Sequence, residues 1–157
     1  LLSRRQRQMC IRDRTRSYKR ADTKELSIKF CDENGKSVMT LEKRMVDLLN
    51  GSWKVTTIDG KKITEENPTM VIDIPEAKLS GFAGCNRMFG GISLDGTAFG
   101  IAFTQVATTR MACPDMKTEQ LFLSALGKVT GFYMIDNFHA ALYQQPQTPI
   151  IIIEKVQ

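Results

Sequence analysis

A single helical period among many strand-sized apolar segments is the feature that most constrains the fold of this chain. The apolar residues that recur at spacings of three and four are Phe122, Ala125, Leu126 and Val129. Pro114 suits the first turn of a helix, Glu119 lies near its positive end, and Gly127 suits its end. We therefore predict one main helix over residues 114–127.

The other apolar residues lie in short segments that turn residues separate. Met70, Ile72 and Ile74, for example, occupy every second position of one such segment, and Pro75 ends it. We expect strands at residues 26–30, 38–41, 53–58, 70–74, 79–82, 101–109, 132–135, 138–143 and 150–154. Strands, one helix and strands again predict the α+β class, with a curved antiparallel β-sheet, a half-barrel, wrapped around one main helix.

The whole chain has a net charge of +5, and its excess of positive charge lies in the first twenty residues. They hold 8 of the 22 basic residues and 1 of the 17 acidic ones, so 14 basic and 16 acidic residues remain, a net charge of −2. A body with this charge has no general attraction for phosphate backbones, and we expect no nucleic-acid partner. No segment approaches the roughly 20 apolar residues that span a bilayer, so we also expect no transmembrane segment.

Residues 1–14 have no usable apolar period and resemble a peptide that arises when sequencing-adapter DNA is translated. We interpret them as a non-native or disordered tail and exclude them from the fold. The alternatives are a solvated basic tail and a nuclear-localisation or RNA-binding arm. We expect the true start of the protein, with its signal sequence, to lie outside this chain.

A weak internal repeat sets the predicted domain boundaries. Tyr18–Lys43 resembles Tyr133–Lys155, since each has an aromatic start, two strands around a polar turn, and an aliphatic residue before a final Glu-Lys. We interpret residues 15–47 as the C-terminal hairpin of a preceding copy plus a linker, and residues 48–157 as one complete domain. The alternative is that any two hairpins look alike.

Three segments of the complete domain carry a family resemblance. They are Leu49-Asn50-Gly51-Ser52-Trp53, the glycine-rich run from Gly81 to Gly91, and Ala107-Thr108-Thr109-Arg110-Met111-Ala112-Cys113 before the helix. In this order they resemble the "L-x-G-x-W", "G-x-x-G-C-N-x-x-x-G" and "T-R-M-A-C" motifs of the META (HslJ-like) domain family, and the resemblance extends over the whole predicted domain. The resemblance gives these motif residues: Trp53, Gly81, Gly84, Cys85, Asn86, Gly90, Thr109, Arg110, Met111, Cys113 and Glu119.

The chemistry of these residues is mainly structural. Glycines allow positive φ or close backbone approach, Asn86 suits a left-handed or capping position, and Trp53 suits a buried anchor whose N–H has a partner. We expect Arg110 either to brace the Gly84–Asn86 turn by donating to carbonyls, which we favour, or to face a ligand.

Cys85 and Cys113 lie in two of the three motifs. Either they form a disulfide, as in an envelope protein, or they are two buried free thiols. Cys10 and Cys31 have no obvious partner.

The residue inventory argues against catalysis. The chain has one histidine, His139, and a nucleophile pair would need it beside Cys85 or Cys113. There is no metal-type spacing and no phosphate-binding glycine loop. We predict no enzyme activity, no cofactor and no metal.

Two non-enzymatic functions remain. The HslJ resemblance implies a heat-shock-associated lipoprotein accessory or protein-interaction module in the bacterial cell envelope, on the periplasmic side, lipid-anchored or soluble. The alternative is a carrier of lipid or a small apolar ligand in a groove between sheet and helix. A solvent-open apolar pocket would favour the carrier, and a closed core with an exposed apolar patch would favour the interaction module. The sequence does not predict an oligomeric state.

Overall fold

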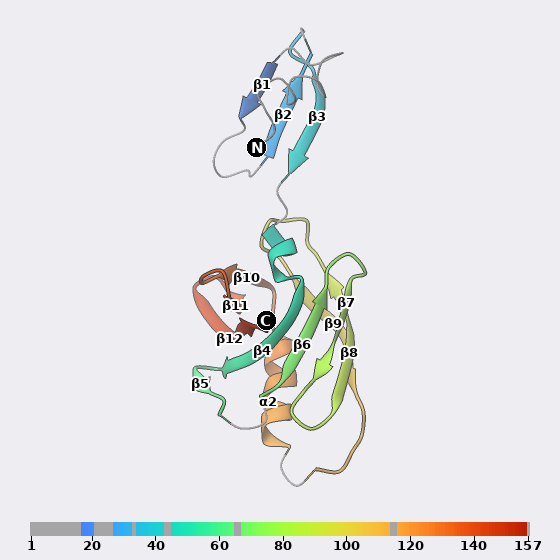
Figure 1. Cartoon of the computed structure of the whole chain (residues 1–157), viewed down its shortest axis with the longest axis vertical. Coiled ribbons are helices and arrows are strands. Elements are labelled where there is room, and N and C mark those ends of the chain that lie inside the picture. Colours follow the sequence, from blue (N-terminus) through green and yellow to red (C-terminus); the bar gives the residue numbers. More distant parts are fainter. Residues whose placement is uncertain are drawn as a thin grey trace. The chain divides into compact units, whose positions relative to one another are not determined.

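Two structural units divide the chain, residues 1–44 and 45–157 (Figure 1). The computed structural model describes residues 17–20, 27–32, 34–42, 45–64, 67–113 and 116–156. The predicted tail at residues 1–14 lies outside the described residues. The division falls three residues before the predicted boundary at Leu48, because Val46 is buried in the core of the second unit.

The first unit is a three-stranded antiparallel sheet in the order β1-β2-β3. Its strands are β1 (Ser17–Arg20), β2 (Ser27–Cys31) and β3 (Ser37–Glu42). Asp32 forms the turn between β2 and β3, since its Oδ1 accepts hydrogen bonds from the N–H groups of Asn34 and Lys36. Gly35 follows with a φ of +80°, a conformation that suits glycine.

The second unit begins with a short 3-10 helix, η1 (Met45–Leu49), that the sequence did not predict. Its strands are β4 (Gly51–Ile58), β5 (Lys61–Lys62), β6 (Thr69–Asp73), β7 (Lys78–Phe82), β8 (Arg87–Ser93), β9 (Ala102–Thr108), β10 (Gly131–Met134), β11 (His139–Gln145) and β12 (Thr148–Lys155). They form one antiparallel sheet in the order β10-β11-β12-β4-β6-β7-β8-β9, and β5 pairs with β4. The sheet therefore places the last three strands beside the first one.

The predicted helix is α2 (Lys117–Leu126). Its predicted start at Pro114 lies outside the described residues. Phe122, Ala125 and Leu126 are buried at the predicted spacing, and α2 packs against β4 and β12. Gly127 follows the helix with a right-handed φ of −66°, so it ends α2 without the left-handed turn that glycine often supplies.

An antiparallel sheet with one short helix is confirmed, but the sheet is less curved than a half-barrel. The outer edges at β9 and β10 meet at one isolated bridge, between Gly100 and Gly131. The adjoining hydrogen bonds join Phe132 N to Phe99 O and Ile101 N to Thr130 O. Because β9 and β10 meet only there among the described residues and do not pair along their lengths, the sheet is not closed.

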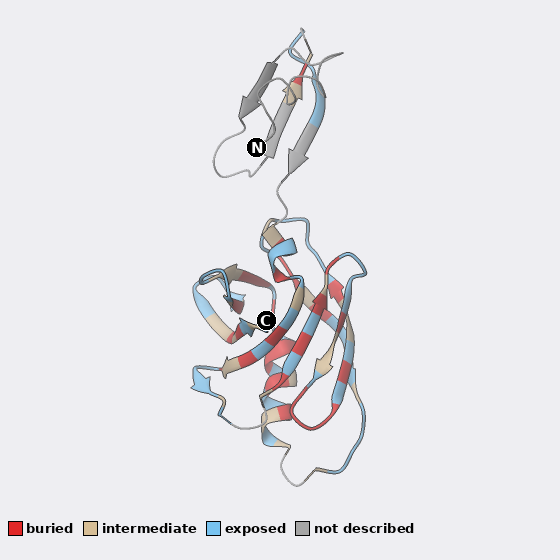
Figure 2. Cartoon of the chain, in the orientation of Figure 1, coloured by how far each residue is buried: buried red, intermediate tan, exposed pale blue. Residues whose placement is uncertain are grey.

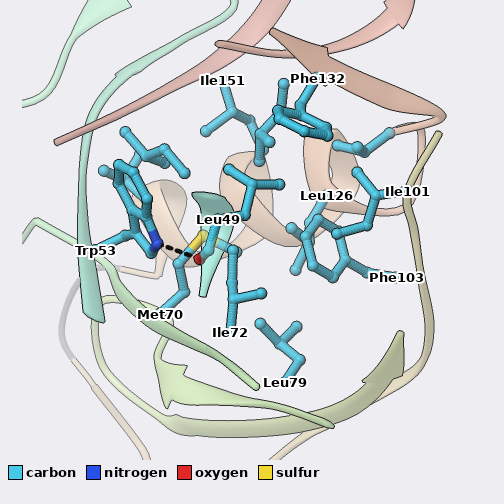
Figure 3. Close-up of a cluster of buried hydrophobic side chains, with 14 of the residues drawn as sticks. Leu49, Trp53, Met70, Ile72, Leu79, Ile101, Phe103, Leu126, Phe132 and Ile151 are labelled. Carbon is cyan, nitrogen blue, oxygen red and sulfur yellow. Dashed lines mark hydrogen bonds between the residues drawn. The ribbon is translucent and has the colours of Figure 1, made fainter. Parts of the chain in front are cut away.

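The core of the second unit draws side chains from the sheet, η1 and α2 (Figure 2). Trp53 is completely buried, and its Nε1 donates to the Leu49 carbonyl oxygen at 2.6 Å. Figure 3 shows this bond with Met70 beside it. The predicted role of Trp53 as an anchor with a partnered N–H is confirmed, and η1 supplies the partner.

Candidate functional site

A buried carboxylate lies where the motif segments meet. Glu119 is in the first turn of α2, three residues before Phe122, so both side chains face the interior. Glu119 Oε2 accepts hydrogen bonds from the backbone N–H groups of Cys85 at 3.3 Å and Asn86 at 2.8 Å. The helix thus holds the turn between β7 and β8.

Asn86 extends this network on its other side. Its Nδ2 donates to both Glu119 carboxylate oxygens, at 3.1 and 3.2 Å. Its Oδ1 accepts from Thr109 Oγ1 at 2.9 Å and from the Met111 N–H at 2.8 Å. One buried amide therefore joins α2 to the segment that follows β9, and we call Cys85, Asn86, Thr109, Met111 and Glu119 the motif cluster.

A disulfide between Cys85 and Cys113 closes the same junction, with the two Cα atoms 6.3 Å apart. Of the two alternatives for these cysteines, the structure has the bridge. Cys31 is a buried free thiol, and Cys10 lies outside the described residues. The disulfide and the motif cluster together hold two loops and the start of the helix region.

Arg110 does not brace the turn as we expected. It is exposed, and within the described part of the chain its guanidinium has no hydrogen bond or ion pair to the Gly84–Asn86 turn. The inward-facing groups of this turn are N–H donors, and a guanidinium only donates. An acceptor is needed there, and Glu119 supplies it. The sequence places Glu119 in the motif and near the positive end of the helix, and its spacing of three residues from Phe122 also indicates the buried face.

The motif glycines act through close backbone approach. A Cβ on Gly81 would meet the backbone carbonyl oxygen of Thr69 on β6, and Gly81 and Gly84 both have positive φ. A Cβ on Gly90 would lie 3.0 Å from Val106 Cγ2, where β8 and β9 shift register. These positions shape the strands that carry the motif cluster, whereas Trp53 lies in the core.

His139 belongs to a separate turn. Asp136 Oδ1 accepts from the N–H groups of Phe138 and His139, both at 2.7 Å, and Asp136 Oδ2 lies 2.8 Å from His139 Nδ1. The Phe138 N–H and then the His139 side chain hold the pKa of Asp136 below its ordinary value. Cys85 and Cys113 bond to each other, so neither is a thiolate that His139 would activate. Across the described residues, no three His, Cys, Asp or Glu side chains are grouped to hold a metal ion.

Two open hollows lie on the surface of the second unit. The first, about 300 Å³, is lined by Phe103, Gln105, Val106, Thr108, Leu123 and Gly127, between β9 and α2. The second, about 360 Å³, is lined by Asp47, Leu48, Met134, Asp136, Asn137 and Lys155. Each has polar and apolar walls, so neither is a purely apolar groove.

Three apolar side chains are exposed on neighbouring strands of the outer sheet face. They are Val71 on β6, Phe82 on β7 and Phe89 on β8, and Phe89 is 54% exposed. Val71 and Phe89 pair with the same residue, Ser80, from its two sides, and Phe82 is two positions further along β7. We call Val71, Phe82 and Phe89 the outer apolar patch.

Comparison with known proteins identifies a family and a fold. The META domain family matches residues 44–155. An NMR structure of a protein from Burkholderia xenovorans is similar with a TM-score of 0.53 and 23% identity, and the match covers 71% of this chain and 86% of that one. A second NMR structure has a TM-score of 0.52 and 17% identity, with 70% of this chain and 92% of that one covered. At these identities the likeness concerns the fold alone.

No curated protein matches the chain. Within the described residues, no helix has the length and apolar content to cross a membrane.

Proposed function

The chain belongs to the META domain family, and from that membership we propose that its second unit is a non-enzymatic interaction module of the cell envelope. The observation that carries the proposal is the outer apolar patch over a filled core. Val71, Phe82 and Phe89 lie on three adjacent strands and face away from a core whose large side chains are completely buried. Grouped apolar side chains on a surface are typical of partner-binding sites, and aromatic residues are enriched there.

The motif cluster supports a structural role for the residues that define the family. Glu119 and Asn86 are buried, and their oxygen and nitrogen atoms bond to the backbone and side chains of neighbouring loops. Catalytic groups must contact a substrate, whereas the polar atoms of Glu119 and Asn86 are buried and hydrogen-bond within the protein. The module would therefore act by presenting a rigid surface.

The disulfide bears on where the module works. Disulfides persist in oxidising compartments, so the Cys85–Cys113 bridge is consistent with an extracytoplasmic location. We propose the periplasmic side of the envelope, where a stress-associated lipoprotein accessory would meet an envelope protein through the outer apolar patch.

A carrier of lipid or a small apolar ligand is the second candidate. The hollow between β9 and α2 favours it, since its volume of about 300 Å³ is at the lower end of ligand pockets. Gln105 and Thr108 add polar walls that an acyl chain does not need. If the protein is a carrier, native mass spectrometry of protein purified from the envelope should show bound lipid.

Site-specific photo-crosslinking tests the interaction module against the carrier. We expect benzoylphenylalanine in place of Phe89 to capture an envelope protein in cells, and the same group in place of Leu121 to capture none. Leu121 is a matched control because it is an exposed apolar residue on the helix, 47% exposed. Equal capture from both positions, or capture of lipid alone, would contradict the proposal.

A further inference from the structure

The first unit repeats the strand pairing of the last three strands of the second unit. Both β1-β2-β3 and β10-β11-β12 are antiparallel sheets in chain order. The β2–β3 pairs are Ser27–Glu42, Ile28–Leu41, Lys29–Thr40, Phe30–Met39 and Cys31–Ser37. The corresponding β11–β12 pairs are His139–Glu154, Ala140–Ile153, Ala141–Ile152, Leu142–Ile151 and Tyr143–Pro149. Each residue of the β2–β3 pairs precedes its counterpart in the β11–β12 pairs by the same number of residues. Ser27, for example, is as far from His139 as Glu42 is from Glu154.

One irregularity is common to the two sheets, and β11–β12 has a second one, between Tyr143 and Gln145, beyond the pairs that β2 and β3 form. The register shifts between Phe30 and Cys31 in the first unit and between Leu142 and Tyr143 in the second, and the same constant offset relates these positions. A third strand pairs antiparallel with the same strand in both sheets, since Phe30 pairs with Tyr18 and Leu142 pairs with Phe132, but Tyr18 and Phe132 are two residues further apart than the other counterparts. Two unrelated hairpins have no reason to share a register and a bulge at the same position of both strands.

The two sheets differ at one edge. In the second unit, β12 pairs with β11 on one side and with β4 on the other, from Ile151–Ile58 to Lys155–Trp53. In the described part of the first unit, β3 pairs with β2, and no strand pairs with its other edge. Among the described residues, the backbone groups on that edge therefore have no strand partner.

Two apolar side chains of β3 are also more exposed than their counterparts on β12. Ile151 is 0% exposed in the core of the second unit, whereas Met39, at the corresponding position of β3, is 45% exposed. Val38 is 45% exposed as well, and its counterpart Ile150 is partly buried against the core. An apolar side chain is thus exposed where the complete fold buries one.

We propose that the open edge of β3 is a strand-acceptor site. Its occupant is the first strand of the META fold whose last three strands are β1–β3, an extended segment with the Gly-x-Trp-x-Val pattern of β4. This segment would pair antiparallel with β3 as β4 pairs with β12, and its apolar side chains would lie beside Met39 on the same face of the sheet. The site belongs to the first unit, so it is separate from the interaction surface proposed for the second.

A peptide-addition experiment tests the acceptor site. The probe is a synthetic peptide with the sequence of residues 49–60, added to the full chain and followed by hydrogen exchange and calorimetry. We expect slower exchange in residues 37–42, and no such effect from a peptide with serine at the positions of Trp53 and Val55. In the chain, Met39→Asp should weaken binding about tenfold or more, because the carboxylate would be partly desolvated against the apolar side chains of the added strand. Lys36→Asp, a charge change in the preceding turn, should leave the affinity within about twofold.

Three outcomes would overturn the proposal. The first is the absence of binding, or binding that Met39→Asp does not change while exchange in residues 27–31 shows that the unit stays folded. The second is protection confined to the second unit, which would mean that the peptide replaces β4 there. The third is a dimer of the chain in light scattering that Met39→Asp dissociates, since a second copy would then occupy the edge.

Discussion

At the scale of single residues, the motif cluster depends on matching donors to acceptors in a buried place. A buried carboxylate is costly unless its oxygens are hydrogen-bonded, and Glu119 receives two backbone N–H groups and the Asn86 amide. The pattern explains why the family motif combines a turn containing Cys85 and Asn86 with an acid at the start of the helix. These residues are characteristic of the fold because their hydrogen bonds join the β7–β8 turn, the segment after β9 and α2.

We expect Glu119→Ala to destabilise the second unit by about 3 kcal/mol. The change leaves the N–H groups of Cys85 and Asn86 buried without an acceptor. Urea unfolding measures the loss, and Gln120→Ala on the exposed face of α2 is the control, with a change below about 0.5 kcal/mol. Equal effects of the two substitutions would show that the Glu119 bonds contribute nothing.

The β10–β11 turn should respond to acid through Asp136. Its pKa lies below the ordinary 3.8 because the carboxylate accepts from the Phe138 N–H and then from the His139 side chain. The ionised form is the one bonded in the fold, so the turn is stabilised above pH 3.8 and loses this contribution as the pH falls through the lowered value.

NMR titration checks this expectation. The carboxyl signal of Asp136 should titrate below pH 3.8, together with the amide shifts of Phe138 and His139. In Asp136→Asn the amide oxygen still accepts and does not ionise, so these shifts should stay constant over the same range. A midpoint at or above 3.8 in the unmodified chain contradicts the assignment.

At the scale of elements, the strands around the motif depend on backbone contacts that a sequence pattern does not describe. Gly81 on β7 faces Met70 on β6 at a distance that has no room for a side chain. Gln105 has a φ of +51° within β9, close to the register shift between β8 and β9. Positive φ is uncommon for a residue other than glycine, and here the positive φ of Gln105 coincides with a β-bulge.

We expect Gly81→Ala to cost roughly 2–4 kcal/mol, because the new Cβ would overlap the Thr69 carbonyl and the backbone would have to move. Gly96→Ala is the matched control, since Gly96 has a φ of +83° but no atom within 4 Å of the added Cβ. Its cost should be about 1 kcal/mol, from the conformation alone. Thermal unfolding of both variants separates the cost of the Cβ–Thr69 overlap from the cost of the positive φ. Similar losses of stability in the two variants would contradict the overlap at Gly81.

At the scale of the whole molecule, the disulfide constrains the unfolded chain more than it adds contacts to the folded one. It joins cysteines with a sequence separation of 28, and the loop it closes contains β8, β9 and the segment before α2. Loop-closure entropy for this length corresponds to roughly 3–4 kcal/mol of stability. The bridge therefore stabilises the part of the sheet that carries Phe89 and most of the motif cluster.

We expect a reducing agent to lower the urea midpoint of the unmodified chain and to leave that of the Cys85→Ala, Cys113→Ala double variant unchanged. Cys31→Ala is the control and should keep the full response to reduction, because Cys31 is a free thiol. Equal midpoints with and without reducing agent would show that the bridge does not contribute to stability.

By itself, the sequence determined the family, the antiparallel sheet, the helix α2 and the burial of Trp53. These features follow from local periodicity and from motifs in a fixed order, which are properties of neighbouring residues. The buried face of α2 at Phe122 and Leu126 was predictable for the same reason.

Only the tertiary structure decided which motif residues bond to one another. Arg110 and Glu119 are both polar residues of the third motif region, and the orientation of the Cys85–Asn86 N–H groups selects the acceptor over the donor. The pairing of Cys85 with Cys113, the limited curvature of the sheet and the shared register of β2–β3 and β11–β12 also depend on contacts between distant segments. Such contacts are set by backbone geometry and packing, which the order of residues does not state.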